Sequence, residues 1–365
     1  MNSERPVVAF ISDAEEFAGA EHYMVLILEA LSDRFDFILV AGDHVADETV
    51  DKAAAAGART IKVEGLRRRP SPAAIVRLAR VLRQSGPALV HLNATDQGDA
   101  IAAFAASRFD RAPLLVTLHN MIPGRAARRE RLSRSLLRRT DQVIAVSDGV
   151  GGYLGREGIR HAVVKNGLMP PQLDRRARER LGLDSHSFVV GGIGRLHEQK
   201  GWDVLCAAAP MIKTRAPEVR ISVVGDGPLR DRLKRVPGAD EVRFHGYLPD
   251  ASSLLGAFDL LVIPSRYEGL GLVAIEGMLA GIPIVATSIN GLSEALGDAA
   301  RLVPPDQPRL LADAVVEMIG DPGQREYLVK RAGERARRLF HRDRMAEQTA
   351  AVYESLLGVP VEAGI

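Results

Sequence analysis

Residues 264–278 read Pro-Ser-Arg-Tyr-Glu-Gly-Leu-Gly-Leu-Val-Ala-Ile-Glu-Gly-Met, and they follow the apolar run Leu260–Ile263. The apolar run is typical of a buried strand of a parallel sheet. The glycines after it predict a tight turn into a helix, whose N-terminus favours an anion. Glu268 lies in the turn and Glu276 about two helical turns further on, so both carboxylates can approach one side of the helix start. The alternative to a ligand site is a purely structural turn whose two glutamates are solvated.

Working outward, short β-rich runs alternate with amphipathic segments along the whole chain. This alternation predicts an α/β fold of parallel sheets covered by helices on both faces. The predicted strands are Val7–Ser12, Phe37–Ala41, Leu89–Asn93, Leu114–His119, Val143–Ser147, Phe188–Ile193, Arg220–Val224, Val242–Phe244, Leu260–Pro264 and Ile284–Thr287. The pattern restarts near residue 188, so we expect two Rossmann-like domains at 1–167 and 188–340, joined by a linker at 168–187.

Composition limits the classes of function. The hydrophobic content is 46%, the charged content is 26% and the net charge is +2, which fits a globular protein without a strong field towards nucleic acid. Cys206 is the single cysteine, so an intramolecular disulfide and a multi-cysteine metal site are excluded. The sequence shows no signal-peptide pattern and no apolar run of spanning length. We therefore expect a cytoplasmic protein.

A second motif, residues 194–201, follows the predicted strand that ends at Ile193. Arg195 and Lys200 place two cations at the mouth of a strand–loop–helix unit, where they can neutralise a diphosphate. Gly192 and Gly194 also begin a partial dinucleotide fingerprint, but His197 occupies its third glycine position. A partial match of this kind is weak, so nicotinamide binding is disfavoured.

The first half contributes two candidate residues. Gly19 lies between the first predicted strand and its helix, where glycine is the default residue of an ordinary tight turn. His119 ends a predicted strand, where it can donate to a sugar hydroxyl or to a developing charge, or be a satisfied structural histidine.

These motifs together resemble the retaining family 4 glycosyltransferases, or glycosyl transferases group 1. Glu268 and Glu276 match that family's Glu-x7-Glu signature, residues 194–201 its Gly-Arg-Leu…Lys-Gly motif, and residues 117–120 its Thr-x-His-Asp element, with Asn120 in place of Asp. The resemblance implies the GT-B architecture, in which two Rossmann-like domains face an interdomain cleft. It also implies a C-terminal helix, at about 341–358, that packs back on the first domain.

The resemblance further implies roles for individual residues. Glu276 would hold the ribose of the donor, Glu268 would lie beside the donor sugar, and Arg195 and Lys200 would grip its diphosphate. Residues 17–21, around Gly19, resemble the family's small-residue loop under the donor phosphates. The catalytic candidates are His119, Arg195, Lys200 and Glu268. The donor-binding candidates are Gly19, Arg195, Lys200, Glu268, Gly269, Gly271, Leu272 and Glu276.

The implied activity is retaining transfer of a sugar from a nucleotide-sugar to an acceptor hydroxyl. The first domain would bind the acceptor and the second the donor. A UDP-sugar is favoured and GDP-mannose comes next, whereas the sequence leaves the acceptor and the oligomeric state open. No metal and no cofactor are expected, because no Asp-x-Asp pair of the metal-dependent glycosyltransferases is present. The competing functions are a sugar-nucleotide epimerase, a phosphorylase-like enzyme with a pyridoxal cofactor, and a catalytically silent nucleotide-sugar-binding partner protein.

Two arginine-rich runs, residues 67–83 and 125–139, also carry leucines at helical spacing. A basic helix face of this kind can bind anionic lipid at the inner face of a membrane. The same pattern is explained by a helix whose arginines face solvent and whose leucines pack into the protein core.

Overall fold

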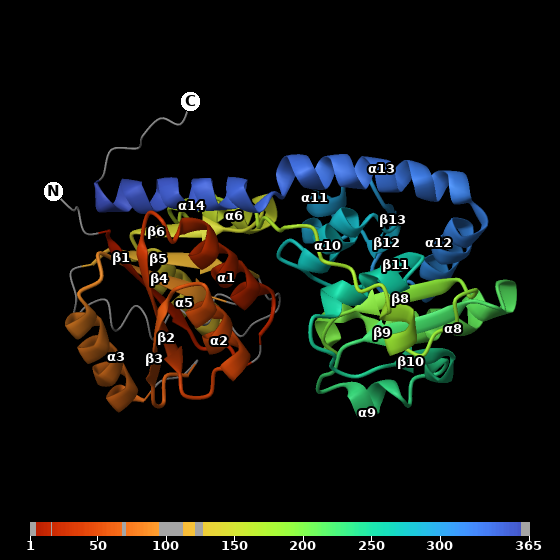
Figure 1. Cartoon of the computed structure of the whole chain (residues 1–365), viewed down its shortest axis with the longest axis horizontal. Coiled ribbons are helices and arrows are strands. Elements are labelled where there is room, and N and C mark those ends of the chain that lie inside the picture. Colours follow the sequence, from red (N-terminus) through yellow and green to blue (C-terminus); the bar gives the residue numbers. More distant parts are fainter. Residues whose placement is uncertain (1–4, 16, 68–70, 95–111, 121–126, 359–365) are drawn as a thin grey trace. The chain divides into compact units, whose positions relative to one another are not determined.

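The computed structural model describes residues 5–15, 17–67, 71–94, 112–120 and 127–358, the side chains of 127–130 excepted. Within these ranges the chain forms two compact units. The first unit contains the residues up to Gly167 together with those from Arg342 onward, and the second contains Leu168–His341. Each unit holds a parallel sheet flanked by helices (Figure 1), which confirms the predicted α/β fold class.

The described part of the first unit holds a parallel sheet of seven strands in the order β3-β2-β1-β4-β5-β6-β7. β1, β4 and β5, at the centre of the sheet, are mostly apolar and are buried almost throughout. Their bounds are β1 Val7–Ser12, β2 Asp36–Gly42, β3 Arg59–Val63, β4 Leu89–Ala94, β5 Leu114–Leu118, β6 Gln142–Ala145 and β7 His161–Val163.

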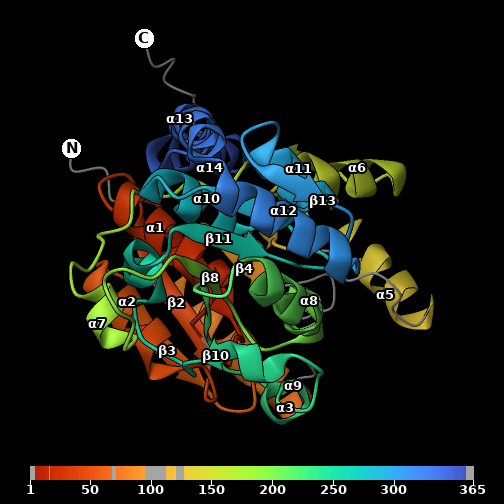
Figure 2. The ribbon, with the colours of Figure 1, turned by 90° about the vertical axis from the view of Figure 1, so that its right-hand side faces the viewer.

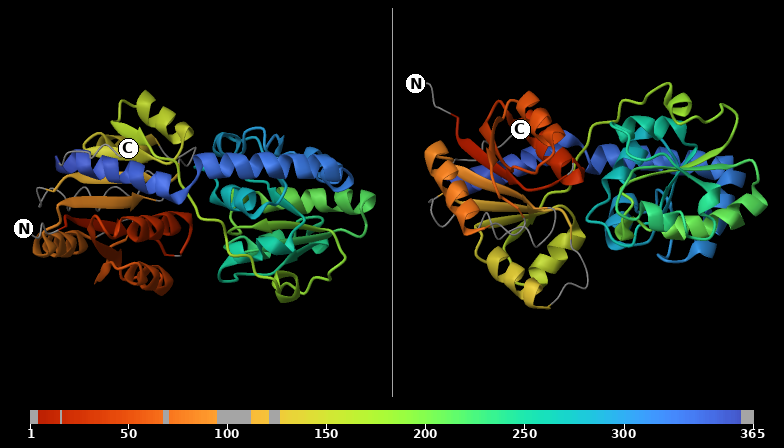
Figure 3. Two further views of the ribbon diagram at one scale, coloured as in Figure 1. Left: turned by 45° about the horizontal axis from the view of Figure 1, so that its top comes forward. Right: turned by 90° about the horizontal axis from the view of Figure 1, so that it is seen from below.

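Helices cover both faces of this sheet. α1 (Gly19–Leu31), α2 (Asp47–Ala55) and α14 (Arg342–Leu357) lie on one face, and α3 (Pro72–Ser85), α5 (Ala127–Leu137) and α6 (Asp148–Arg156) lie on the other (Figure 3). Alternate residues of each strand face the two sides, so Val90 packs towards α3 and His91 towards α14.

The terminal helix α14 packs against α1 and β4 of the first unit. Tyr353 anchors it, because this ring is fully buried and its hydroxyl lies 2.7 Å from Nδ1 of His91. Arg34, which follows α1, pairs with Glu347 at 3.0 Å and with Glu354 of α14.

The described part of the second unit holds six strands in the order β10-β9-β8-β11-β12-β13. Their bounds are β8 Val189–Ile193, β9 Arg220–Val224, β10 Val242–Phe244, β11 Leu260–Ile263, β12 Ile284–Thr287 and β13 Arg301–Val303. α8 (Trp202–Arg215) and α12 (Pro308–Gly320) pack side by side on one face (Figure 2). α10 (Leu272–Ala280) and α11 (Asn290–Leu296) cover the other, and α13 (Pro322–Leu339) contacts α10.

Residues 168–187, the proposed linker, lie in the second unit. The amide of Asp174 donates to the carbonyl of Ser253 at 2.9 Å, and Arg178 pairs with Asp259 at 2.6 Å. The segment includes the short helix α7 (Ala177–Arg180). The other short helices are α9 (Arg230–Leu233) and the 3-10 turns η1 (Glu198–Lys200), η2 (Ala239–Glu241) and η3 (Ala251–Ala257).

Three strands were not predicted, and all three lie at sheet edges: β3, β7 and β13. Edge strands have one solvent-exposed side, so they need fewer apolar residues than central ones. None of them is buried over more than one residue, and the sequence of β3, Arg-Thr-Ile-Lys-Val, carries two charges.

Candidate functional site

The second unit brings the two motifs of its half together at one edge of its sheet. β8 and β11 are neighbours, although β9 and β10 lie between them in sequence. From β8 the chain builds the sheet in one direction and from β11 in the other, which makes this pair the topological switch point, where open α/β sheets bind ligands. The loop after β8 carries Arg195 and Lys200, and the loop after β11 carries Glu268.

Lys200 and Glu268 form an ion pair between these two loops. Nζ of Lys200 lies 2.7 Å from Oε1 of Glu268, which also accepts a hydrogen bond from Oγ of Ser265 at 2.8 Å. Nε2 of Gln199 donates to the other oxygen of Glu268 at 3.2 Å. The Glu268 side chain is only 8% exposed, so three donors fix this carboxylate in place.

Glu276 belongs to the same site but sits on α10, which begins only at Leu272. Glu268 therefore lies in the loop before the helix. Glu276 follows it by eight residues, and the first half of this span is loop, so only the part from Leu272 onward, about one helical turn, is helix. Burial raises the pKa of Glu276 to about 7, and the positive charge of Lys200 opposes this rise. The Glu276 carboxyl is therefore partly protonated at neutral pH, unlike an ordinary surface glutamate.

Glycine is required where the two loops touch. Gly201 has φ +66°, and a Cβ on it would lie 2.1 Å from the carbonyl oxygen of Pro264. Gly271 has φ +79°, and it is the residue that precedes α10. Gly271 lies between Leu270 and Leu272, two residues after Gly269, so the first free amides of α10 follow this turn at the ligand edge.

Arg195 is exposed on the same loop as Lys200. Its backbone carbonyl accepts a hydrogen bond of 2.9 Å from Nε1 of the buried Trp202, the first residue of α8. The backbone of Arg195 is thereby anchored while its side chain reaches solvent.

Sequence reasoning missed Arg266, which holds the two loops together. Its guanidinium binds both carboxylate oxygens of Asp203, at 2.7 and 3.0 Å, and also Asp306 at 2.7 Å. Its amide donates to the carbonyl of Gln199 at 2.7 Å. The partners lie 63 and 40 residues away in sequence, so only the fold reveals them.

Gly291 was also missed, and it carries a testable consequence for the Glu268 turn. A Cβ on Gly291, in α11, would lie 2.5 Å from the carbonyl oxygen of Glu268 and 2.8 Å from that of Gly269. We expect Gly291→Ala to displace this turn and to lower the free energy of unfolding by roughly 1–3 kcal/mol, the usual cost of overpacking.

Gly320→Ala is the matched control for Gly291→Ala. Gly320 ends α12 with open space where its Cβ would be, so this variant should be neutral or slightly more stable. Urea denaturation of both variants measures the difference. Equal stability of Gly291→Ala and the wild type would contradict the close packing of α11 on the turn.

The first unit gathers its candidates at its own switch point, between β1 and β4. Gly19 begins α1, after the loop that follows β1, and His119 follows β5, the neighbour of β4. Nε2 of His119 lies 2.8 Å from Oδ1 of Asn93 on β4, and Nδ2 of Asn93 donates to the carbonyl of Ala20 at 2.9 Å. Burial lowers the pKa of His119 to about 3, so the imidazole is neutral at physiological pH.

Two further titratable groups near this edge are core residues. His91 is fully buried between Tyr353 and Thr117, at 2.7 Å from each hydroxyl, and burial holds its pKa well below the usual range. Glu21 in the first turn of α1 is 1% exposed, and burial raises its pKa to about 7. Neither position was among the predicted site residues.

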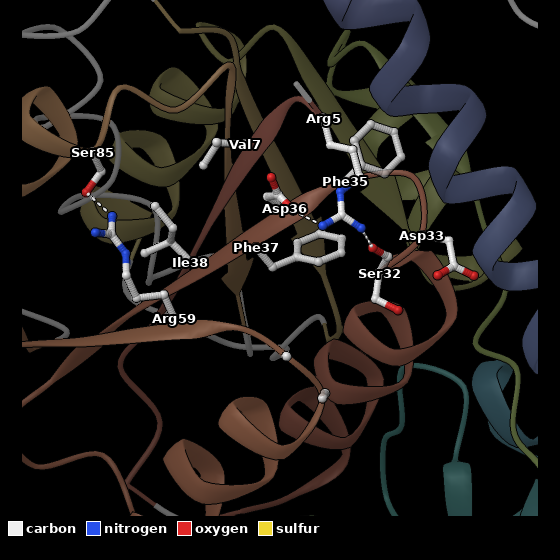
Figure 4. A pocket seen from close by; sticks show the side chains of 12 residues that line it. Arg5, Val7, Ser32, Asp33, Phe35, Asp36, Phe37, Ile38, Arg59 and Ser85 are labelled. Atoms are coloured by element: carbon white, nitrogen blue, oxygen red, sulfur yellow. Dashed lines mark hydrogen bonds and ion pairs between the residues drawn. The ribbon is translucent and has the colours of Figure 1, made fainter. Parts of the chain in front are cut away.

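A cavity of about 530 Å³ lies elsewhere in the first unit. Its lining residues include Val7, Asp36 and Phe37, at the amino ends of β1 and β2 (Figure 4). This is the opposite edge of the sheet from Gly19, which follows β1, and His119, which follows β5. Four of its polar side chains are paired with one another: Arg5 with Asp36 at 2.7 Å, and Arg59 with Ser85 at 3.2 Å. Since parallel sheets bind ligands at their carboxyl edge, this cavity is not the candidate site.

Comparison with known proteins agrees with the two halves of the fold. A family model described as Glycosyltransferase Family 4 matches residues 17–169, and one described as Glycosyl transferases group 1 matches residues 187–321. The lipopolysaccharide core biosynthesis mannosyltransferase LpsB of Rhizobium meliloti is 30% identical over 240 residues, which cover 62% of this chain and 68% of that protein. This chain belongs to glycosyltransferase family 4. A glycogen synthase of Mycobacterium tuberculosis is likewise 30% identical, over 73% of this chain and 68% of that protein.

Solved structures show that this family 4 glycosyltransferase has the GT-B fold. HepE of Anabaena, crystallised with UDP and glucose, superposes with a TM-score of 0.83 at 24% identity, over 96% of this chain and 100% of that one. Sucrose-phosphate synthase of Thermosynechococcus elongatus superposes with a TM-score of 0.80 at 22% identity, over 97% of this chain and 100% of that one.

The arginine-rich runs of the glycosyltransferase are partly neutralised. Arg77 pairs with Glu64 at 3.2 Å, and Arg134 and Arg138 share Glu157 at 2.9 and 3.5 Å. Arg68, Arg69 and Arg125 lie outside the described residues, as do the side chains of Arg128 and Arg129.

Membrane spans and metal clusters are both absent from the described part of the chain. None of its helices combines the length and the apolar character that crossing a membrane requires. The same residues contain no cluster of three or more His, Cys, Asp or Glu side chains that could hold a metal ion.

Proposed function

We propose that this family 4 enzyme is a retaining glycosyltransferase that moves a sugar from a nucleotide diphosphate sugar to an acceptor hydroxyl without a metal ion. A UDP-sugar is the first candidate donor and GDP-mannose the second. The observation that carries the proposal is the meeting of Lys200, Glu268 and Glu276 at the switch point of the second unit, with the amide end of α10 beside them. One cation and a helix N-terminus suit a diphosphate, and a carboxylate suits ribose hydroxyls.

In the proposed reaction the bond between the anomeric carbon and the diphosphate breaks, and the acceptor oxygen attacks from the same face. The leaving diphosphate takes the proton of the acceptor hydroxyl, so no protein nucleophile is needed. Lys200 and Arg195 stabilise the charge that develops on the diphosphate, which is electrostatic catalysis by preorganised groups. Glu268, held by three donors, orients the sugar, and His119 supplies a neutral ring nitrogen from the first unit.

The proposed reaction assigns one substrate to each unit. The second unit, whose switch point carries the cations, binds the donor, and the first unit binds the acceptor. A second crystal structure of HepE contains UDP-glucose, which supports a UDP-sugar as the donor of this enzyme. The mannosyltransferase LpsB supports mannose as the alternative sugar.

We also propose that the enzyme works in the cytoplasm, with its basic runs against anionic lipid at the inner face of the membrane. Cosedimentation with phosphatidylglycerol vesicles, against phosphatidylcholine vesicles, tests the lipid contact.

A panel of nucleotide-sugars tests the proposed function without knowledge of the acceptor. Ligands that bind the native state raise its melting temperature, so the true donor should produce the largest shift. Slow hydrolysis of that donor should release a free sugar whose first-formed anomer, followed by NMR, has the configuration of the donor. Inverted configuration would exclude retention. A melting shift without hydrolysis or transfer would favour the silent nucleotide-sugar-binding partner protein, and no shift with any nucleotide-sugar would overturn the proposed function.

An epimerase and a phosphorylase-like enzyme would each give a different result in the same experiment. An epimerase of the same fold would release an epimeric sugar or nucleotide-sugar without an acceptor. A phosphorylase-like enzyme would show visible absorbance from a lysine-bound pyridoxal group.

Metal independence gives a further prediction. Because helix amides and the cations Lys200 and Arg195 replace a bridging metal in the proposal, donor hydrolysis should keep most of its rate after exhaustive chelation. The measurement is the initial rate with and without EDTA in dialysed enzyme. Complete loss that magnesium or manganese restores would overturn the prediction.

A further inference from the structure

We propose that Asn93 is a positioning residue, which holds His119 as the neutral tautomer with its proton on Nε2 and so leaves Nδ1 as a hydrogen-bond acceptor for a sugar hydroxyl. This inference rests on the proposed function, since it specifies how His119 meets the substrate. It changes the expected chemistry of His119 from donating a hydrogen bond to accepting one.

The orientation of the Asn93 amide follows from its two neighbours. One end of this amide faces the carbonyl oxygen of Ala20, at 2.9 Å, and the other faces Nε2 of His119, at 2.8 Å. A backbone carbonyl only accepts hydrogen bonds, so the NH₂ group of Asn93 must face Ala20. The oxygen of Asn93 then faces His119, and it must receive a proton from Nε2.

The position of this proton decides the chemistry of the rest of the His119 ring. A neutral imidazole carries one proton, so a proton on Nε2 leaves a lone pair on Nδ1. Within the described residues no hydrogen bond to Nδ1 is present, and the ring edge of Tyr23 packs against the imidazole with centroids 4.8 Å apart. The titratable neighbours on the adjoining elements are Tyr23 of α1 and His91 of β4, both uncharged at neutral pH, so they do not favour an imidazolium.

Asn93 also links two parts of the candidate site. Ala20 is the second residue of α1, directly after Gly19, while His119 follows β5. Asn93 is 1% exposed at the end of β4, so its side chain is fixed between them. The start of α1 and the histidine are therefore held by one amide. A polar residue near the end of a mostly apolar strand was the sequence signal for Asn93.

The test is NMR of the full chain labelled with 15N, without any substrate, in which His119→Gln identifies the His119 signals. We expect a slowly exchanging N–H on Nε2 of His119, because exchange slows when this proton is hydrogen-bonded and buried. Asn93→Leu should lose the protected signal. Asn93→Asp should keep it and raise the pKa of His119 by two or more, since a carboxylate beside the ring favours the imidazolium.

His91 provides the internal control for folding, because it lies on the same strand and contacts Thr117 and Tyr353 instead. Its own hydrogen-bonded ring N–H signal should persist in both Asn93 variants. A protected N–H on Nδ1 of wild-type His119, or an unchanged Nε2 signal in Asn93→Leu, would overturn the proposal.

A kinetic measurement separates this role from a merely structural one. Asn93→Leu should lower kcat of sugar transfer by roughly ten- to a hundredfold, the effect of a misplaced group, while KM for the donor stays nearly constant. An unchanged kcat in a variant that has lost the Nε2 signal would refute the positioning role. Failure of the proposed function would appear separately, as absence of donor binding and turnover in the wild type.

Discussion

Replacing Lys200 with alanine is expected to lower the turnover of donor by roughly ten- to a thousandfold, the range for removing a group that stabilises developing charge. The variant removes the cation that the proposed mechanism places against the leaving diphosphate. It also breaks the 2.7 Å ion pair with Glu268, which keeps two other donors, Ser265 and Gln199. We therefore expect Glu268 to stay close to its position, so that the loss reports mainly on the missing charge. The measurement is kcat for donor hydrolysis and for transfer.

Lys234→Ala is the matched control, because Lys234 is exposed and its ion pair within the described chain is with Asp231, which is exposed as well. Its kinetics and stability should equal those of the wild type, since exposed ion pairs contribute little. Arg195→Ala should resemble Lys200→Ala with a smaller effect, since Arg195 is the more exposed cation. Near-normal turnover in both Lys200→Ala and Arg195→Ala would remove the diphosphate role from this loop.

The second large effect is expected at Glu276, the proposed ligand of the ribose. Glu276→Ala should weaken binding of nucleotide-sugar and free nucleotide alike by roughly ten- to a hundredfold, because hydrogen bonds to a charged group contribute about 1.5–3 kcal/mol each. Glu268→Ala should weaken the nucleotide-sugar more than the free nucleotide, since Glu268 is placed beside the sugar. Calorimetric titration of both ligands measures the contrast. Equal losses for the two ligands in Glu268→Ala would show that its sugar-side role is wrong.

The raised pKa of Glu276 adds a pH dependence with a definite sign. Ribose hydroxyls donate best to the ionised carboxylate, so affinity for a nucleotide-sugar should rise as pH increases through the Glu276 pKa of about 7 and level off above it. A nucleotide-sugar is used because the terminal phosphate of a free nucleotide itself titrates near pH 6. The variant Glu276→Gln should bind with nearly constant affinity from pH 5.5 to 8. The same pH dependence in the variant as in the wild type would assign the proton to another group.

The same carboxyl should also affect folding. Its pKa is about 7 in the folded chain and 4.5 for an ordinary glutamate, so the folded state binds the proton more tightly and stability falls as pH rises between these values. The full difference corresponds to at most about 3 kcal/mol. Glu276→Gln should therefore match the wild type at pH 4.5 and exceed its stability at pH 8, as measured by urea denaturation. A variant less stable than the wild type at pH 8 would contradict the burial of this charge.

Much of the fold could be predicted because central strands are strongly apolar. All ten predicted strands exist within one or two residues of their expected ends, for example Val7–Ser12 and Val242–Phe244. The edge strands β3, β7 and β13 escaped prediction because exposure on one side removes the apolar signal. Glycine-rich turns were equally informative, since Gly271 and Gly201 have positive φ values that other residues rarely adopt.

The sequence by itself determined which groups could act: Lys200, Glu268 and Glu276 were recognisable from residue type, spacing and position after a strand. Only the tertiary structure decided which strands are neighbours, because the order β10-β9-β8-β11-β12-β13 arises from the packing of apolar faces and not from local pattern. That order brings the loops after β8 and β11 together and forms the ion pair between Lys200 and Glu268, 68 residues apart. It also supplies Arg266, Gly291 and Asn93, whose contacts join segments far apart in the chain. Burial, which shifts the pKa values of Glu276 and His119, likewise exists only once the chain has folded.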